Sequence, residues 1–319
     1  MAVRLGINPI GWTNDDLPEL GDDIPLEVCL SEARETGYAG IELGRKFPRR
    51  AEELRPLLAR YGLSLISGWY GARLRDRSAR EEIEAMQDHL ELLSALGCQV
   101  LVFAEVSGSI HGRREIALSR RPTLGPAEWT NFGERLTEVA EHVHGRGLRI
   151  AYHHHMGTVV QTEDEIDRVM AVSGEAVGLL LDTGHLRCAG GNVVEVARRH
   201  AQRVVHVHCK DVRADVLAKV LHADRSFLEA VLAGVFTVPG DGAIDYAPLL
   251  AVLKSAATRA GWSSRPSRTP PWPIPRRTRA SASITCGARS PPTRATPDAR
   301  AVRYGLLSRT SSQDGNGTR

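Results

Sequence analysis

The amino-acid sequence predicts an α/β protein with the architecture of a (β/α)₈ TIM barrel, and three observations support this. Seven apolar, strand-like segments alternate with helical segments between residues 4 and 208, which favours a barrel over a doubly wound sheet. No glycine-rich phosphate-binding motif follows the first strand, which counts against a dinucleotide-binding fold. Polar side chains gather where the strands end, which is the edge at which such a barrel carries its active site.

Each expected strand is a short and nearly continuous apolar run, as parallel strands covered by helices require. Strands are expected at Arg4–Asn8, Gly40–Gly44, Ser64–Trp69, Gln99–Glu105, Arg149–His155, Val177–Asp182 and Val204–His208. The segments between them have amphipathic spacing, and most of them end at a glycine that favours a left-handed helix cap. Helices are expected at Leu26–Thr36, 50–60, 79–96, Pro126–His144, Glu163–Met170 and Val193–His200.

The pattern changes after the seventh strand. A long connection at Val212–Gly242 leads to a helix at Asp245–Ala257, and no apolar strand follows it. Eight of the 17 prolines lie between residues 266 and 297, in a stretch without apolar periodicity. We therefore predict an incomplete barrel whose eighth strand and helix are missing or replaced. The expected domains are a TIM-barrel catalytic domain at 1–257 and an aberrant, disordered Arg/Pro/Ser-rich tail at 258–319.

Charge and cysteine content limit the partners and the compartment. Residues 256–319 contain 12 Arg and 2 Asp, so the remaining 29 basic and 36 acidic side chains give residues 1–255 a net charge of −7. An acidic body is a poor match for nucleic acid, and no apolar run is long enough to span a membrane. The N-terminus has no signal-peptide pattern. Five scattered cysteines are typical of a reducing cytoplasm, so we expect a cytoplasmic protein.

The segment Val204–Asp211 is the most informative in the chain, because it alternates apolar residues with His206 and His208 and thus predicts a strand with both imidazoles on one face. A structural histidine pair is the alternative interpretation. Two earlier strands also end in histidines, at His153–His155 and Asp182–His185, so six of the 12 histidines lie at three strand ends. Alternation places residues 153 and 155 on one face, and at least one of 153–155 is expected to be structural.

A mixed set of imidazole and carboxylate groups suits a divalent transition metal, with Mn or Co favoured where oxygen ligands predominate. Such an ion polarises a carbonyl, and a nearby base can then remove the adjacent proton. Each candidate also has a structural interpretation. Asp182 could cap the following turn, Glu42 and Glu105 could be ion-paired fillers of the barrel, and Lys210 could form a loop salt bridge. His185 could support a ligand rather than bind the ion.

Six segments together resemble the myo-inosose-2 dehydratase family, and the resemblance spans about residues 1–256. They are Gly6–Asp16, Val102–Gly108, Tyr152–Thr158, Leu181–His185, His206–Asp211 and Phe236–Gly242. The His-x-His and Asp-Thr-Gly-His pieces alone would indicate only the wider superfamily of xylose isomerase-like barrels.

The resemblance implies a TIM barrel that dehydrates scyllo-inosose (2-keto-myo-inositol) to a trihydroxycyclohexane-1,2-dione in inositol catabolism. It implies a divalent metal, Mn or Co, and in some members glutathione. The metal would polarise the ketone, a base would take the α-proton, and hydroxide would leave from the β-carbon. The expected partner is a small cyclic polyol ketone, with no nucleic acid or membrane; a homo-oligomer is left open.

The resemblance also implies roles for individual residues. The metal ligands would be His153, Asp182 and His208, and His153 stands where related sugar epimerases have a glutamate. The remaining roles follow the polar strand ends and their flanking loops. The candidate catalytic residues are Glu105, His185 and Lys210, and the candidate substrate-binding residues are Asn8, Trp12, Glu42, Trp69, His155 and Arg213.

The chain departs from the family at its C-terminus. Family members continue with a strand that supplies a fourth ligand, a glutamate, where this chain reads Gly261–Pro270 without any acidic residue. We predict that a frameshift near residue 257 replaced the natural ending; the nucleotide sequence tests this, and the hypothesis is wrong if no single-base change restores the family ending. Loss of the strand would leave strands one and seven as unpaired edges and would predict low activity and poor solubility.

Three other functions remain as alternatives. The first is a keto-sugar epimerase or isomerase on the same barrel, which would exchange the α-proton without losing water. The second is a DNA-repair endonuclease of the same superfamily, or a protein that binds nucleic acid through its basic tail, against which the acidic body argues. The third is an inactive frameshifted product without a biochemical role.

Overall fold

The computed structural model describes residues 4–259 and 282–285, with side chains described from Leu5 to Ala256. The chain divides into one unit at Met1–Gly287 and a second at Ala288–Arg319, and all of the second unit lies outside the described residues. The predicted disorder of residues 258–319 therefore falls almost entirely outside them. The domain boundary after residue 257 stays a prediction.

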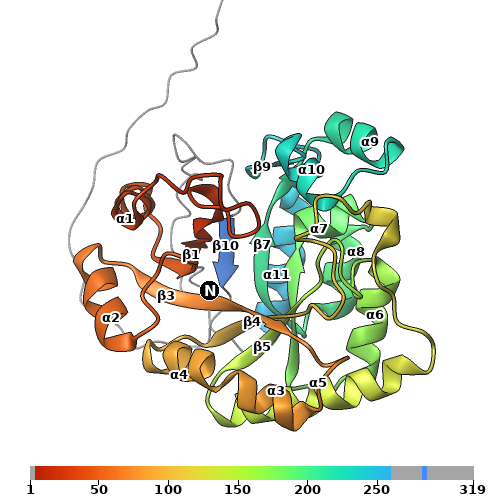
Figure 1. Cartoon of the computed structure of the whole chain (residues 1–319), viewed down its shortest axis with the longest axis horizontal. Helices are drawn as coiled ribbons and strands as arrows, with labels where there is room; N and C mark the ends of the chain where they lie inside the picture. The colour runs from red at the N-terminus through yellow and green to blue at the C-terminus, as the bar shows by residue number, and fades with distance from the viewer. Residues whose placement is uncertain (1–3, 260–281, 286–319) are drawn as a thin grey trace, which may run out of the picture. The chain divides into compact units, whose positions relative to one another are not determined.

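Seven strands pair in parallel in the order β1 to β7, as the sequence predicts for a TIM barrel (Figure 1). The strands are β1 Arg4–Ile7, β2 Gly40–Leu43, β3 Ser64–Ala72, β4 Val100–Glu105, β5 Arg149–His153, β6 Val177–Asp182 and β7 Val204–Cys209. Their burial is nearly complete from β4 onward, because helices cover the outer face and side chains fill the interior. The predicted α/β barrel is confirmed.

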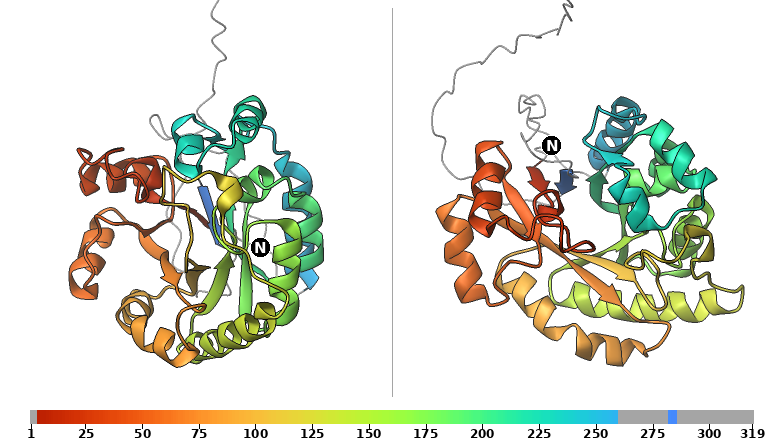
Figure 2. Two further views of the ribbon diagram at one scale, coloured as in Figure 1. Left: turned by 45° about the vertical axis from the view of Figure 1, so that its right-hand side comes forward. Right: turned by 45° about the horizontal axis from the view of Figure 1, so that its top comes forward.

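Helices follow the strands and lie outside them, so that they surround the sheet (Figure 2). Those of the barrel are α1 Leu26–Glu35, α2 Ala51–Arg60, α3 Ala79–Ala85, α4 Gln87–Ala95, α5 Glu128–Gly145, α6 Glu163–Val172, α7 Thr183–Cys188, α8 Val193–His200 and α11 Tyr246–Arg259. Two 3₁₀ turns occur at η1 Pro9–Gly11 and η2 Leu118–Arg120. The helix expected at 79–96 is divided at Met86, which is fully buried and ends α3.

The eighth position of the barrel is filled by β10, a four-residue strand at Ala282–Thr285. It pairs antiparallel with β1 on one side and with β7 on the other, which closes the barrel. The expectation that strands one and seven are unpaired edges is therefore wrong. Strands pair only through their backbone N–H and C=O groups. A short segment of unrelated sequence that runs antiparallel to both edge strands can therefore supply their missing hydrogen bonds. The prediction of a replaced eighth strand agrees with this arrangement.

The connection after β7 is more ordered than the sequence indicates. It contains β8 Asp211–Val212, α9 Ala214–His222, α10 Phe227–Leu232 and β9 Phe236–Thr237, and β8 pairs antiparallel with β9. Its apolar side chains form a separate cluster that includes Val212, Phe227 and Val235 together with Met156, which follows β5. Because Met156 lies just beyond the end of its strand, this cluster packs over the carboxyl ends of the strands.

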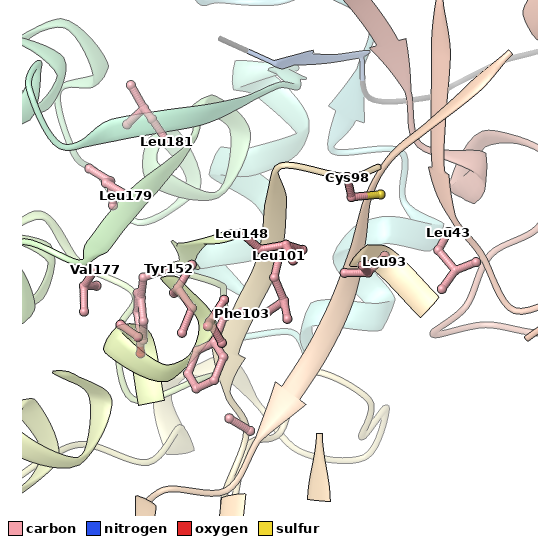
Figure 3. Packing of buried hydrophobic residues seen from close by; sticks show 14 of the residues in the cluster. Leu43, Leu93, Cys98, Leu101, Phe103, Leu148, Tyr152, Val177, Leu179 and Leu181 are labelled. Carbon is pink, nitrogen blue, oxygen red and sulfur yellow. The ribbon is translucent and has the colours of Figure 1, made fainter. Parts of the chain in front are cut away.

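Two apolar clusters separate the outer and inner faces of the strands. The larger lies between strands and helices and includes Leu101, Phe103, Tyr152, Leu179 and Leu181 (Figure 3). The smaller fills the barrel interior and consists of Val100, Val102, Ala151, Leu180 and Val205. Successive strand residues thus alternate between the two clusters. The same alternation determines whether a polar side chain at a strand end points into the barrel or toward the helices.

No helix among the described residues is long and apolar enough to cross a membrane.

Candidate metal centre

Three residues at the carboxyl ends of β5, β6 and β7 bring their side chains together inside the barrel. His153 is the last residue of β5, Asp182 the last of β6, and His208 pairs with Asp182 in register. Each is no more than 3% exposed, and each offers a ligand atom within 4.8 Å of the others. A register shift in β7 opposite Leu179 and Leu180 keeps His206 and His208 on the inner face.

The contacts within this group centre on one oxygen of Asp182. Its Oδ2 atom lies 3.3 Å from Nε2 of His153 and 3.3 Å from Nδ1 of His208. The Nδ1 atom of His208 is buried and finds no hydrogen-bond partner among the described residues, so its short approach to the carboxylate is not a hydrogen bond. The contact of His153 with Oδ2 has hydrogen-bond geometry, so the buried Nδ1 atom of His208 is the one that a shared cation would satisfy.

Asp182 uses its two carboxylate oxygens for different contacts. The Oδ1 atom accepts a hydrogen bond of 2.9 Å from the backbone N–H of His185 and so caps α7. The Oδ2 atom faces the two histidines and the Nζ atom of Lys210, which is 2.7 Å away. The structural interpretation of Asp182 as a cap and its functional interpretation as a ligand are therefore compatible, because they use different atoms.

The protonation states of Asp182 and His153 suit a metal centre, whereas the raised pKa of His208 favours its protonated form, which must lose its proton to bind an ion. Burial by itself raises the pKa of Asp182, but Lys210 and the neighbouring imidazoles outweigh burial and hold this pKa well below its usual range. Burial lowers the pKa of His153 to about 3, which keeps that imidazole neutral. Burial also opposes the charge of His208, but the carboxylates of Glu42 and Asp182 prevail and raise its pKa. An ionised carboxylate and a neutral imidazole are the forms that bind metal.

A second group of potential ligands lies beside the first and shares His208 with it. It consists of Glu42, His206 and His208. The Oε1 atom of Glu42 lies 2.8 Å from Nε2 of His206 and 3.1 Å from Nε2 of His208, and both contacts have hydrogen-bond geometry. Asn8, at the end of β1, also donates to this carboxylate, at 2.6 Å.

Lys210 and His185 lie next to the Asp182 oxygen that faces the centre. The Nζ atom of Lys210 is 3.2 Å from Nε2 of His185. The side chain of Lys210 is 13% exposed, whereas that of His185 is buried. Burial, together with the neighbouring His155 and Lys210, holds the pKa of His185 well below its ordinary value. A neutral imidazole thus stands beside an ammonium group, which is an arrangement that can both accept and donate protons.

Aromatic rings pack beside the centre, and one of them is exposed to solvent. Trp69 is 39% exposed, and its ring packs edge-on against His153 at 5.2 Å and His155 at 5.7 Å between ring centres. His111 contacts both Trp69 and His155 and lies 4.0 Å from Asp16. The sequence reasoning missed His111 and Asp16, because it searched strand ends and both residues lie in loops.

Three predicted site residues have their polar atoms engaged elsewhere. Glu105 accepts backbone N–H bonds from Leu74 at 2.6 Å and from Ser107 at 2.8 Å. Trp12 is 3% exposed and donates to Glu32 at 2.7 Å. The guanidinium of Arg213 donates within its own loop, to the carbonyl of Gly234 and the side chains of Thr237 and Asp241. The predicted catalytic role of Glu105 and the substrate contacts of Trp12 and Arg213 stay predictions.

The residues present fit a divalent transition ion. His153, Asp182 and His208 would hold it through two nitrogens and one oxygen, a three-ligand set that leaves coordination positions open for substrate. The buried Nδ1 atom of His208, which lacks a hydrogen bond within the described part of the chain, supports this fit.

The sequence is similar to one protein family and to several named proteins. Residues 30–276 match the xylose isomerase-like TIM barrel family. The rhizopine catabolism protein MocC from Rhizobium meliloti is 50% identical over 262 residues, which cover 82% of this chain and 80% of that protein. An inosose dehydratase from Geobacillus thermodenitrificans (strain NG80-2) is 44% identical over 262 residues, which cover 82% of this chain and 88% of that protein.

Solved structures share the fold at low sequence identity. The probable 3-DHS dehydratase AsbF from Bacillus anthracis superimposes with a TM-score of 0.57 at 13% identity, over 79% of this chain and 89% of that one. The IolI protein, crystallised with a bound zinc atom, superimposes with a TM-score of 0.55 at 19% identity, over 79% and 85% of the two chains.

Proposed function

The chain belongs to the inosose dehydratase family of xylose isomerase-like TIM barrels, and from this premise we propose that it is a metal-dependent hydro-lyase acting on scyllo-inosose. The observation that carries the proposal is the convergence of His153, Asp182 and His208 on one buried point beside the ammonium of Lys210. The IolI protein, which shares this fold, was crystallised with a bound zinc atom, and this supports a divalent ion in the proposed centre. Mn or Co as the ion, and any need for glutathione, stay predictions.

The chemistry proposed is removal of an α-proton followed by loss of a β-hydroxyl group. A divalent ion bound at the centre supplies Lewis acidity toward the substrate ketone. The imidazole of His185 is the proposed proton acceptor, since it is neutral and lies within reach of Lys210. Lys210 donates a proton to the departing hydroxyl group, so that water leaves and a carbon–carbon double bond forms; the resulting enol then tautomerises to the dione. Trp69 packs against His155 beside the centre, and this pair is proposed to limit the entry of water.

Incubation of the full chain with scyllo-inosose in D₂O tests this proposal. Proton NMR is expected to show metal-dependent loss of the α-proton signal together with appearance of the dione. Exchange of the α-proton without loss of water would favour the keto-sugar epimerase or isomerase. Neither exchange nor elimination, with Mn or Co present and the metal bound, would contradict both and favour the inactive product.

Rhizopine catabolism is the second candidate role, because the relative named for it shares 50% identity with the chain. A cytoplasmic location and the absence of nucleic-acid and membrane partners stay predictions. Whether the chain forms a homo-oligomer is left open.

A further inference from the structure

We propose that Glu42 is a positioning residue that turns the Nδ1 lone pair of His208 toward the metal centre, and that Asn8 holds Glu42 for this purpose. The inference deepens the proposed function and rests on it, because it assigns a task to two residues that the sequence marks as substrate contacts. Glu42 is on β2 and Asn8 follows β1. Around the barrel these strands lie on one side of β7, whereas β5 and β6, which carry His153 and Asp182, lie on its other side.

The carboxylate of Glu42 is fully occupied by protein donors. It is 3% exposed. Its Oε1 atom accepts from Ser67 at 2.8 Å, from Nε2 of His206 at 2.8 Å and from Nε2 of His208 at 3.1 Å. Its Oε2 atom accepts from Nδ2 of Asn8 at 2.6 Å. These contacts leave the carboxylate no free side for a polyol substrate.

The orientation of the Asn8 amide is determined by its other contact. Its Oδ1 atom accepts the backbone N–H of Ile10 at 2.9 Å, so its Nδ2 atom must be the group that faces Glu42. An amide N–H can only donate, and the carboxylate is therefore the acceptor at Oε2.

The tautomer of His208 follows from these bonds. An ionised carboxylate accepts and does not donate, so Nε2 of His208 carries the hydrogen that faces Glu42. In the neutral ring, Nδ1 then has the lone pair. That atom lies 3.3 Å from Oδ2 of Asp182 and has no hydrogen-bond partner among the residues described. A carboxylate that holds the distal N–H of a metal-binding histidine fixes the ring and makes it a better ligand.

The same bonds decide between the two potential metal groups. Each would need a different nitrogen of His208, and one neutral imidazole offers only one lone pair, so the two groups exclude each other. Both nitrogens that Glu42 contacts have hydrogen-bond geometry. In the Asp182 group the contact with His153 also has it, but the Nδ1 atom of His208 does not. The ion therefore belongs with Asp182, and Glu42 lies behind its ligand.

The tautomer is measured directly by long-range ¹H–¹⁵N NMR of the full chain labelled at histidine, without metal and at a pH where His208 is neutral. His208→Gln assigns the resonances. The wild type is expected to show the Nε2–H form of His208, and Glu42→Ala to show a mixture of both forms. Ser67→Ala is the matched control, because it removes one donor to Glu42 but keeps both histidine contacts, and its tautomer should stay that of the wild type.

Cobalt affinity supplies the second measurement. Glu42→Ala is expected to weaken Co²⁺ binding by about 10- to 100-fold, the usual effect of losing such an outer carboxylate. Glu42→Gln should retain part of the affinity, because its amide oxygen can still accept from His208. Thermal unfolding of each variant shows whether it is folded at the temperature of the titration.

An Nδ1–H tautomer in the wild type would overturn the inference, as would an unchanged cobalt affinity in folded Glu42→Ala. A wild type that has the expected tautomer but binds no cobalt would overturn the proposed function, and with it the purpose of the arrangement.

Discussion

The Nδ1 atom of His208 and the Oδ2 atom of Asp182 lie 3.3 Å apart in the buried end of the barrel, and Nδ1 makes no hydrogen bond within the described residues. The two groups come from adjacent strands in register. Glu42 accepts a hydrogen bond from the other nitrogen of His208. The orientation of His208 toward Asp182 is therefore fixed from the far side of its ring.

Asp182→Asn should abolish metal binding while leaving the fold nearly intact. The amide oxygen can still accept the N–H of His185, so the cap of α7 is kept, but the charge that binds the ion is lost. We expect Co²⁺ affinity to fall by more than about 100-fold, the upper end of the loss for outer-shell groups. Calorimetric titration measures the affinity and urea unfolding measures the stability. Equal affinity in the variant would exclude Asp182 as a ligand.

Lys210→Met should reduce turnover without weakening metal binding. Its Nζ atom lies beside Asp182 and His185, where it can protonate a departing hydroxyl group, and general acid catalysis contributes about 10²- to 10⁴-fold to rate. We expect a loss of that order in kcat/KM, with Co²⁺ affinity the same or higher. Lys219→Met is the control, because its side chain is 80% exposed on α9. A wild-type rate in Lys210→Met would remove Lys210 from the mechanism.

Glu105→Gln should affect stability more than turnover. Both oxygens of Glu105 accept backbone N–H groups. In Glu105→Gln the side-chain NH₂ group would face one of these buried backbone N–H groups, and neither could accept a hydrogen bond. The expected cost is about 1–3 kcal/mol in the free energy of unfolding, typical of a buried donor left unpaired. Turnover per folded molecule should change only a few-fold. A loss of kcat at unchanged stability would instead support the catalytic role that the sequence suggests.

Stability should fall as the pH is lowered below about 6.5, the ordinary pKa of histidine. Burial lowers the pKa of His154 to about 4, and its Nε2 atom accepts the backbone N–H of Asp182 at 3.1 Å. Between pH 4 and 6.5 the unfolded chain therefore binds the proton and the folded chain does not. Stability is full above this window and is lost as pH falls through it.

The histidine that causes part of this loss can be identified by substitution. One such proton contributes a slope of about 1.4 kcal/mol per pH unit. His154→Gln should reduce the slope of unfolding free energy against pH by about that amount, because its amide oxygen keeps the acceptor but does not titrate. His144→Gln, at an exposed position on α5, should leave the slope unchanged. Identical slopes in wild type and His154→Gln would contradict the prediction.

We predict a frameshift near residue 257, and restoring the frame there should then increase activity. The family resemblance implies a fourth ligand, a glutamate, on the natural eighth strand, and this chain has no glutamate after residue 255. We expect the repaired chain to bind Co²⁺ more tightly and to turn over scyllo-inosose faster than the present one. Equal turnover by both chains would show that the C-terminal sequence does not limit the enzyme.

The strands, and the gathering of histidines at their ends, could be predicted from local patterns in the sequence, whereas the choice of three of these residues as metal ligands depended on the family resemblance. Alternation alone decides that His206 and His208 share a face, and a barrel brings its strand ends together. The contacts of Asn8 and Glu42 could not be predicted in the same way. Residues 42 and 208 are far apart in the chain, and only the closure of the barrel places Glu42 behind His208.

Two further features lay beyond sequence reasoning for other physical reasons. His111 and Asp16 approach each other from loops, where no periodic pattern fixes the direction of a side chain. The strand at Ala282–Thr285 pairs through its backbone, so its sequence need not resemble that of a barrel strand.

X-ray absorption spectroscopy of the cobalt-loaded full chain tests the central claim most directly. The account predicts one cobalt ion per chain with two imidazole ligands, and His208→Gln should reduce this number to one. A wild-type chain that retains no cobalt, or a spectrum that His208→Gln leaves unchanged, would contradict it.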